Sequence, residues 1–473
     1  MRPVWLGLLC TLACCSKLPL WEGKVDVKPL ERAALKKCGT GKVTAEGAMK
    51  VTRAPYLQST TTTSTMFAWG TRDGKGEVIV EEPDGKVVAR GEAVYAGEPD
   101  LQKARFVAQQ RPGKELTADE LYIVKAEVKG LEPSHLYCYR ILDDGIALTE
   151  RAPMSTAAAP GGKEPIHFVA VGDTGTGDAA ALAVAKQMSS VPFDFLVFMG
   201  DIAYTRGTAD QLESKFFGVY RDYLRYVPAY PALGNHERRT MRGRPYFEAF
   251  VLPEPERYYS FNWGDVHFVA IDTTQRDSAQ LEWLDHDLAA NKLPWVIVFG
   301  HHPMYTNSFR GPQLAIRKAF AKILTDHKVD LVMTGHEHQY ERFKVAGVNY
   351  VISGGGGGHL TRFWGATDAL KQATVHHFLS FAVTATKLEM RAIDIEGKEI
   401  ETLTLEKKPT GEVKTKVDHE RDERQTPLPP EHEVKPDEKL HDEPDDDTKK
   451  DKVPATVPVT GNEPAPAQPP ASS

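Results

Sequence analysis

The sequence is poor in cysteine, in long apolar runs and in positive charge, and each scarcity excludes a class of protein. Its 473 residues include only 5 cysteines, and none of them has the spacing of a metal finger. No stretch approaches the roughly 20 consecutive apolar residues that a transmembrane helix requires. The formal net charge is -7, whereas a nucleic-acid binder usually presents a basic face. We therefore expect neither a nucleic-acid partner nor a membrane-spanning helix.

The chain is long and apolar enough for more than one core. Hydrophobic residues make up 41% and charged residues 26% of it, which suits ordinary globular domains. A chain of 473 residues is too long for one compact core. Two folded domains with additional unstructured segments are therefore expected.

Residues 1–15 have the features of an export signal. Arg2 precedes a short apolar run from Val4 to Ala13. The run ends at Cys14, and Leu12-Ala13-Cys14 resembles the bacterial lipoprotein signal, in which the cysteine is lipidated. Membrane attachment through lipidated Cys14 and simple cleavage of the signal are alternatives. Either makes the protein exported, whether secreted or envelope-anchored. Residues 16–50 show no clear periodicity.

Two cysteines, Cys38 and Cys138, lie beyond the signal. In an exported chain they could form a disulfide. They could equally be two independent small residues, with Cys138 inside an apparent strand. The sequence leaves both readings open.

Residues 51–157 have the pattern of an all-β sandwich. Short runs rich in aromatic and β-branched residues, such as Met66–Trp69 and Glu77–Val80, are separated by turn dipeptides such as Asp73-Gly74. Residues 126–142 read as strand, turn and strand. Regular short strands with turns between them are typical of a sandwich of roughly 100 residues.

Residues 165–405 follow an Ala/Pro/Gly linker and alternate between two patterns. Compact apolar runs suit strands buried on both faces, and they cover residues 166–171, 195–199, 266–271, 295–299 and 331–333. Between them lie helical patterns at residues 179–188, 209–220, 280–290 and 313–325. The alternation predicts an α/β domain with four α/β/β/α layers, in which helices cover two packed sheets.

Residues 406–473 are charged, Pro-rich and almost free of large apolar residues. Such a composition cannot offset the entropy of ordering, so a disordered tail is expected.

Five short motifs follow the predicted strands, and each begins with glycine. They are Gly172-Asp173-Thr174-Gly175, Gly200-Asp201-Ile202-Ala203-Tyr204, Gly234-Asn235-His236-Glu237, Gly300-His301-His302-Pro303 and Gly335-His336-Glu337-His338. Ligands gather at the carboxyl ends of strands in open α/β sheets. A glycine there lets the chain turn sharply, so that the next side chain points into the cleft. Carboxylate, amide, imidazole and phenolate donors at one edge can build two adjacent metal sites.

The order of these motifs resembles the signature of the purple acid phosphatases, within the calcineurin-like phosphoesterase superfamily. Arg53–Gln58 and Gly130–Pro133 similarly resemble the fibronectin type III-like module that precedes many of their catalytic domains. The resemblance implies a ferric ion held by Asp173, Tyr204 and His338. It implies Asp201 as the bridging ligand, and a divalent ion (Zn, Fe or Mn) held by Asn235, His301 and His336.

The same resemblance implies the reaction. A metal-bound hydroxide would attack phosphorus in a small phosphorylated substrate, while both ions neutralise the phosphoryl charge. His236 would be the catalytic residue that stabilises or protonates the leaving oxygen. Three features depart from the family pattern or have no assigned role. His302 stands where relatives have a small or aromatic residue, and Gly311 stands where a further substrate-facing histidine is usual, with Arg310 beside it. The glycine run 354–358 could approach phosphate or form a tight turn.

The sequence thus predicts a metal-dependent phosphatase of phosphate monoesters. A phosphodiesterase or nucleotidase with the same metal core is the alternative. A non-catalytic surface-binding protein belongs to another class, and the intact set of donor residues argues against it.

Overall fold

The computed structural model describes residues 37–39, 41–71, 74–95, 122–364, 368–408 and 413–417. All of them belong to the unit Met1–Pro430. The expected export signal, with Cys14, and most of the expected tail lie outside the described residues. Within the described part of the chain, no helix combines the length and the apolar character needed to cross a bilayer.

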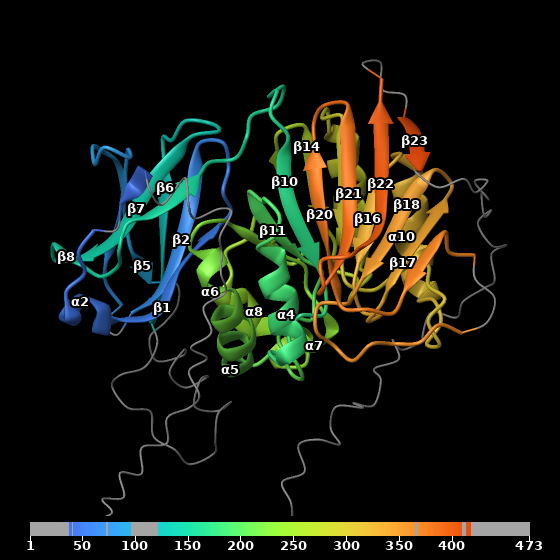
Figure 1. The fold of residues 1–473 in the computed structure, drawn as a ribbon, viewed down its shortest axis with the longest axis horizontal. Coiled ribbons are helices and arrows are strands. Elements are labelled where there is room, and N and C mark those ends of the chain that lie inside the picture. The colour runs from blue at the N-terminus through green and yellow to red at the C-terminus, as the bar shows by residue number, and fades with distance from the viewer. Residues whose placement is uncertain are drawn as a thin grey trace, which may run out of the picture. The chain divides into compact units, whose positions relative to one another are not determined.

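The N-terminal module consists of two antiparallel sheets (Figure 1). One sheet has the order β1-β2-β6-β5, with strands Val51–Gln58, Ser64–Thr71, Tyr122–Lys129 and Val94–Tyr95. The other has the order β4-β3-β7-β8 with β9 also on β7, and its strands are Val87–Glu92, Glu77–Glu81, Leu136–Asp143, Ile146–Ala147 and Ala152–Ser155. Aromatic and branched side chains such as Trp69, Val80 and Tyr139 fill one core between the sheets. The predicted sandwich is confirmed.

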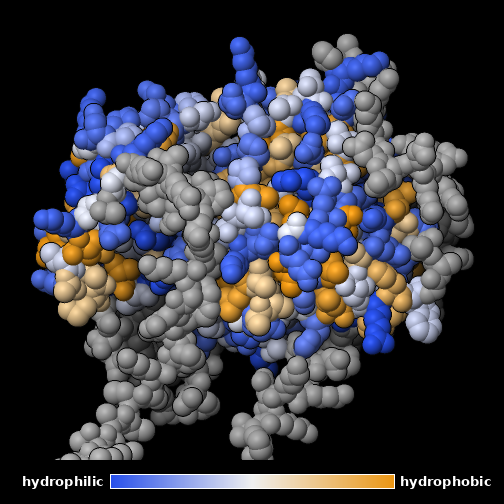
Figure 2. All heavy atoms as spheres, in the orientation of Figure 1, coloured by the Kyte–Doolittle hydropathy of each residue, from blue (hydrophilic) through white to orange (hydrophobic). Residues whose placement is uncertain are grey.

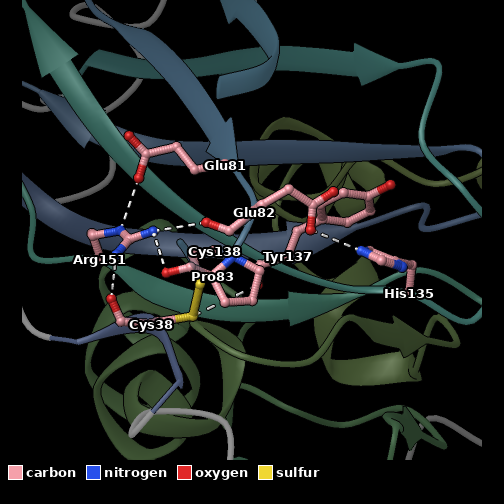
Figure 3. Close-up of a disulfide and its surroundings, with 8 residues drawn as sticks. All are labelled: Cys38, Glu81, Glu82, Pro83, His135, Tyr137, Cys138 and Arg151. Atoms are coloured by element: carbon pink, nitrogen blue, oxygen red, sulfur yellow. Dashed lines mark hydrogen bonds and ion pairs between the residues drawn. A yellow bond between two sulfur atoms is a disulfide. The ribbon is translucent and has the colours of Figure 1, made fainter. Parts of the chain in front are cut away.

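A disulfide between Cys38 and Cys138 ties the segment before helix α2 (Ala45–Lys50) to strand β7, with the two Cα atoms 5.6 Å apart. Figure 3 shows the Arg151 guanidinium beside this bond. It pairs with the buried carboxylate of Glu81 at 2.8 Å and donates to the carbonyl oxygens of Cys38 and Glu82. Of the two alternatives that the sequence left open for these cysteines, the structure has the disulfide.

The second domain contains two seven-stranded sheets. The first has the order β12-β11-β10-β20-β21-β22-β23, with strands Ala229–Pro231, Phe195–Phe198, Ile166–Val171, His377–Val383, Lys387–Asp394, Glu399–Lys407 and Val413–Val417. The second has the order β13-β14-β15-β16-β18-β17-β19, with strands Tyr259–Trp263, Val266–Ala270, Trp295–Phe299, Leu331–Thr334, Val348–Ser353, Tyr340–Val345 and Lys371–Ala373.

Aromatic side chains join the inner faces of the two sheets. Phe168 of β10 stacks on Phe381 of β20 with ring centroids 4.2 Å apart, and its ring meets Phe268 of β14 edge-on at 5.1 Å. Because the inner faces pack against each other, the helices that connect parallel strands must lie on the outer faces. These are α4 (Ala179–Met188) between β10 and β11, α9 (Ser278–Ala290) between β14 and β15, and α10 (Leu314–Asp326) between β15 and β16. The predicted four-layer arrangement is confirmed (Figure 1).

Shorter helical segments follow β11 and β12 in the chain. They are α5 (Ala209–Leu212), a π-helical turn at Glu213–Phe217, α6 (Gly218–Leu224), α7 (Asn235–Arg238), a 3₁₀ turn at Met241–Gly243 and α8 (Arg244–Ala249). The sequence predicted one regular helix over residues 209–220, which the π-helical turn interrupts. In that turn Glu213 pairs with Arg53 of β1 at 2.6 Å, and Lys215 donates to the carbonyl oxygen of Tyr204.

The sequence placed the start of the tail at residue 406, but two strands extend beyond that position. Strand β22 continues to Lys407, and β23, residues Val413–Val417, pairs with it in antiparallel register. On the face drawn in Figure 2, hydrophobic side chains form several separate patches among hydrophilic ones.

Candidate metal centre

The expected donor residues lie at the carboxyl ends of five strands that come from both sheets. Strands β10, β11 and β12 lead to Asp173, Asp201 and Asn235, and strands β15 and β16 lead to His301 and His336. Three of these donors have left-handed backbone conformations, with φ of 61° at Asp173, 52° at Asp201 and 69° at His336. Non-glycine residues with positive φ are uncommon and concentrate at functional sites. At Asp173 and His336 the left-handed residue is therefore the donor and not the preceding glycine, whereas Gly200 before Asp201 is left-handed as well, with φ of 82°.

Asp173, Tyr204 and His338 form the first group of donors. The Tyr204 hydroxyl lies 3.0 Å from Asp173 Oδ1 and 3.0 Å from His338 Nε2. His338 Nε2 is 3.4 Å from Asp173 Oδ1. His338 Nδ1 lies 2.7 Å from the carbonyl oxygen of His359, so its Nδ1–H donates there and leaves Nε2 facing the other two residues.

Asp201, Asn235, His301 and His336 form the second group. His301 Nε2 lies 3.1 Å from Asp201 Oδ2, 3.0 Å from Asn235 Oδ1 and 3.3 Å from His336 Nδ1. The other ring nitrogen of His301 lies 2.8 Å from the carbonyl oxygen of Met199, which fixes the orientation of the ring. One carboxylate oxygen each from Asp173 and Asp201, with a ring nitrogen of His301, lies within 4.8 Å of the others. The structure therefore brings all seven expected donors together.

Burial and charge at this site favour a bound cation. Asp173 and Asp201 are 0% and 2% exposed, and no Lys or Arg pairs with either of them within the described residues. Burial opposes ionisation of Asp201, but the imidazoles of His301 and His236 outweigh it and hold the pKa of that carboxyl well below its usual range. Burial alone would lower the pKa of His301, yet Asp201 raises it to about 10. A metal ion would replace the proton that His301 carries.

His236 lies beside this cluster and not within it. Its Nδ1 is 2.7 Å from the carbonyl oxygen of Thr205, to which it donates, and its Nε2 is 3.8 Å from Asp201 Oδ2. The side chain is 14% exposed. The imidazole Nε2 is thus held at the partly open edge of the donor cluster.

Glycines allow the ligand loops to approach one another closely. A Cβ atom at Gly335 would lie 2.3 Å from Asp173 Oδ2, and one at Gly358 would lie 2.5 Å from the ring of His338. In the run 354–358 the N–H groups of Gly354, Gly356 and Gly358 donate to backbone carbonyl oxygens. Those three groups are therefore occupied in holding the run against the metal site, and the run acts as a close-packed turn.

A family model for the calcineurin-like phosphoesterases matches residues 166–340, which contain all seven donors. Residues 166–340 form a calcineurin-like phosphoesterase domain. Part of the chain is also similar to purple acid phosphatase 22 of Arabidopsis thaliana, with 29% identity over 294 residues. That alignment covers 58% of this chain and 63% of the plant protein, so the chain spans less than two thirds of that relative's length.

Two further relatives extend the similarity. Tartrate-resistant acid phosphatase type 5 of Sus scrofa is 26% identical over 294 residues, which are 50% of this chain and 85% of that protein. Purple acid phosphatase PPD1 from yellow lupin (Lupinus luteus) seeds has a similar fold, with a TM-score of 0.67 and 20% sequence identity. This match covers 76% of the chain and 75% of the lupin protein.

Glu237 of the phosphoesterase domain has a role that the sequence did not reveal. Its fully buried carboxylate accepts four backbone N–H groups. Oε2 accepts from Asp201 and Gly234 at 2.9 and 3.0 Å, and Oε1 accepts from Ile202 and Ala203 at 3.0 and 3.1 Å. Glu237 thus fixes the loop that carries Asp201 and Tyr204. In the sequence Glu237 is marked only as an acid that directly follows the expected donor Asn235 and its neighbour His236.

His302 and Arg310, whose roles the sequence left open, support the ligands. His302 is buried, its Nδ1 lies 2.9 Å from Thr273 Oγ1, and its ring lies 4.4 Å from the ring of His336. Burial and the neighbouring His301 hold the pKa of His302 well below its usual range, so the imidazole is neutral. Arg310 donates to the carbonyl oxygen of His336 at 3.3 Å and lies 3.8 Å from the Glu337 carboxylate.

Arg276 is a cation of the same domain that the sequence did not single out. Two nearby arginines have carboxylate partners, since Arg257 pairs with Asp272 and Asp277, and Arg238 lies 3.7 Å from Asp272. In contrast, Nη1 of Arg276 is buried without a hydrogen-bond partner in the described structure. The positive charge of Arg276 also helps to lower the pKa of His302, after burial and His301. One guanidinium nitrogen of Arg276 is therefore without a hydrogen-bond partner in the described structure, and its charge acts on His302, next to the expected ligand His301.

Proposed function

We propose that this chain hydrolyses phosphate monoesters at a two-metal centre. The observation that carries the proposal is the convergence of seven buried or partly buried donors from five strand ends, with no lysine or arginine paired with the two carboxylates in the described residues. The similarity to purple acid phosphatases supports the same chemistry. Because the chain spans only part of its first relatives, the activity and the substrate remain our proposal.

The residues present fit the metal pair that the sequence predicted. Asp173, Tyr204 and His338 supply two hard oxygen donors and an imidazole, a set that suits Fe(III). Asn235, His301 and His336 supply an amide oxygen and two imidazoles, which suit a divalent ion such as Zn, Fe or Mn. Asp201 contacts the second group and follows β11 three residues before Tyr204, so we assign it as the bridge. When bound, such ions neutralise phosphoryl charge and make water acidic enough to attack phosphorus.

We assign His236 to the leaving group. Its Nδ1–H donates to the carbonyl oxygen of Thr205, which holds Nε2 toward the partly open edge of the site. In the protonated ring this nitrogen can pass a proton to the departing alkoxide, which matters most when the alkoxide is strongly basic. We assign Arg276, whose Nη1 has no hydrogen-bond partner among the described residues, to supply positive charge for the non-bridging phosphoryl oxygens.

Hydrolysis of 4-nitrophenyl phosphate beside bis(4-nitrophenyl) phosphate tests this proposal. We expect the full chain, loaded with iron and zinc, to prefer the monoester in kcat/KM, and Asp201→Asn to lose activity together with bound metal. A preference for the diester would replace the proposal with a phosphodiesterase. Absence of hydrolysis of either ester by the metal-loaded chain would favour a surface-binding protein.

We also propose export, with attachment through lipidated Cys14. The support is the apolar run before Leu12-Ala13-Cys14 and the disulfide, a bond typical of oxidising compartments. Mass spectrometry of the native protein and of Cys14→Ser tests the anchor. Two identical unlipidated soluble products would refute it.

A further inference from the structure

Two loops beside the metal centre pair to form a short antiparallel ribbon, which we call the rim ribbon (residues 307–309 and 362–364). A bridge joins Ser308 to Phe363. The N–H of Phe309 donates to the carbonyl oxygen of Arg362 at 3.1 Å, and the N–H of Trp364 donates to that of Asn307 at 2.9 Å. The first strand of the ribbon comes from the β15–α10 loop and the second from the β18–β19 loop.

The pairing places two large aromatic side chains on one face of the rim ribbon. Phe309 is opposite Arg362, and Trp364 is two residues beyond Arg362, so Phe309 and Trp364 are diagonal neighbours on that face. Phe309 is 57% and Trp364 is 77% exposed, and Arg362 is exposed as well. Ser308, on the opposite face, is buried. The alternation leaves two aromatic rings and a guanidinium facing outward.

The rim ribbon is anchored to the loop that carries two of the expected metal ligands. The N–H of Thr361, three residues before Trp364, donates to the carbonyl oxygen of His338 at 3.1 Å. Arg310, next to Phe309, donates to the carbonyl oxygen of His336 at 3.3 Å. Three residues of extended chain span at most about 10 Å. The backbone of Trp364 therefore lies within about 10 Å of Thr361, whose N–H contacts the segment that carries His338.

We propose that the rim ribbon binds a flat aromatic group of the substrate, so that the favoured esters are nucleoside monophosphates or similar phosphates with a ring beyond a short polar spacer. The inference rests on the proposed phosphatase function. Exposed aromatic side chains stack on any flat ring, and a guanidinium adds a cation–π contact. The continuity of the aromatic face with the ligand loop favours a part of the substrate over a separate partner.

Adenosine 5′-monophosphate and ribose 5-phosphate form a matched pair for the test, because they share the sugar and the leaving oxygen and differ in the base. We expect the metal-loaded full chain to favour the nucleotide in kcat/KM by roughly tenfold, the order that stacking on one aromatic side chain provides. Trp364→Ala should remove most of that preference through KM, and Trp364→Phe should restore part of it. Val94→Ala, at a 69% exposed position of the N-terminal module, should keep the preference unchanged.

Equal kcat/KM values for the two esters, or a preference that survives Trp364→Ala and Phe309→Ala, would overturn the inference and leave the phosphatase function standing. If the chain hydrolyses neither ester, the proposed function fails, and calorimetric titration with the same two compounds decides the inference. Tighter binding of the nucleotide that is lost in Trp364→Ala supports the aromatic face. Equal binding of both compounds refutes it.

Discussion

Replacing Glu237 with glutamine should damage the metal centre without touching a metal ligand. Each carboxylate oxygen of Glu237 accepts two backbone N–H groups, one pair from Asp201 and Gly234 and the other from Ile202 and Ala203. An amide has only one oxygen, so its NH₂ group would face two N–H donors whichever way it is turned. Each buried donor left without an acceptor costs about 1–3 kcal/mol. The substitution should therefore cost about 2–6 kcal/mol of unfolding free energy.

Urea unfolding followed by circular dichroism measures this cost, and metal analysis measures its consequence for the site. We expect Glu237→Gln to shift the unfolding midpoint downward and to bind less metal, because the loop that carries Asp201 loses its fixed position. Glu248→Gln is the matched control, since Glu248 forms a partly exposed i,i+4 pair with Arg244 and such pairs contribute little. A Glu237→Gln protein with the unfolding midpoint and metal content of the control would refute the reasoning.

Four further predictions follow from the same geometry. Tyr204→Phe should lose the visible absorption band that a phenolate–iron pair produces while remaining folded, and a fully active colourless parent with two zinc ions would contradict the iron assignment. His236→Ala should keep both metals but lose about 10²–10⁴-fold in rate, with a smaller loss for esters of acidic alcohols; direct assay of both metals checks it. Arg276→Ala should weaken inhibition by inorganic phosphate and raise KM with little change in kcat, and an unchanged inhibition constant would exclude it from the phosphate site. Burial holds the pKa of His377 at about 4, below its value in the unfolded chain. The stability that neutral His377 contributes is therefore complete above about pH 6.5 and is lost as the pH falls toward 4, because the unfolded chain takes up the proton first. His377→Asn should reduce the loss of unfolding free energy between pH 7 and pH 5 by about 2 kcal/mol.

The sequence predicted where the expected donors would come together, because each motif that carries them follows a recognisable buried strand. The apolar runs before Asp173, Asp201, His301 and His336 can only be strands covered on both faces, and parallel strands bring their carboxyl ends to one edge. Because the motifs follow these strands, the seven donor residues are expected to lie together at that edge. The roles assigned to them stay predictions, whereas their convergence is a property of the fold.

Features that depend on the backbone path could not be predicted in this way. The role of Glu237 requires four N–H groups from two loops to converge, and no local pattern encodes that convergence. Arg276 stands out only after the partners of its neighbouring arginines are known. The π-helical turn at Glu213–Phe217 depends on contacts with the preceding module, because local propensity alone favours a regular helix. The edge strand Val413–Val417 was missed because its lysines resemble those of the tail.

The left-handed conformations of Asp173, Asp201 and His336 also bear on how this protein can evolve. Each such residue costs the folded state about 1 kcal/mol or more, a cost that glycine would largely avoid. Aspartate and histidine are among the side chains that tolerate this region best. A descendant that no longer needed the metals could gain stability by replacing these three positions with glycine. Retention of the two aspartates and the histidine in a population of such chains would thus be a signature of selection for the site.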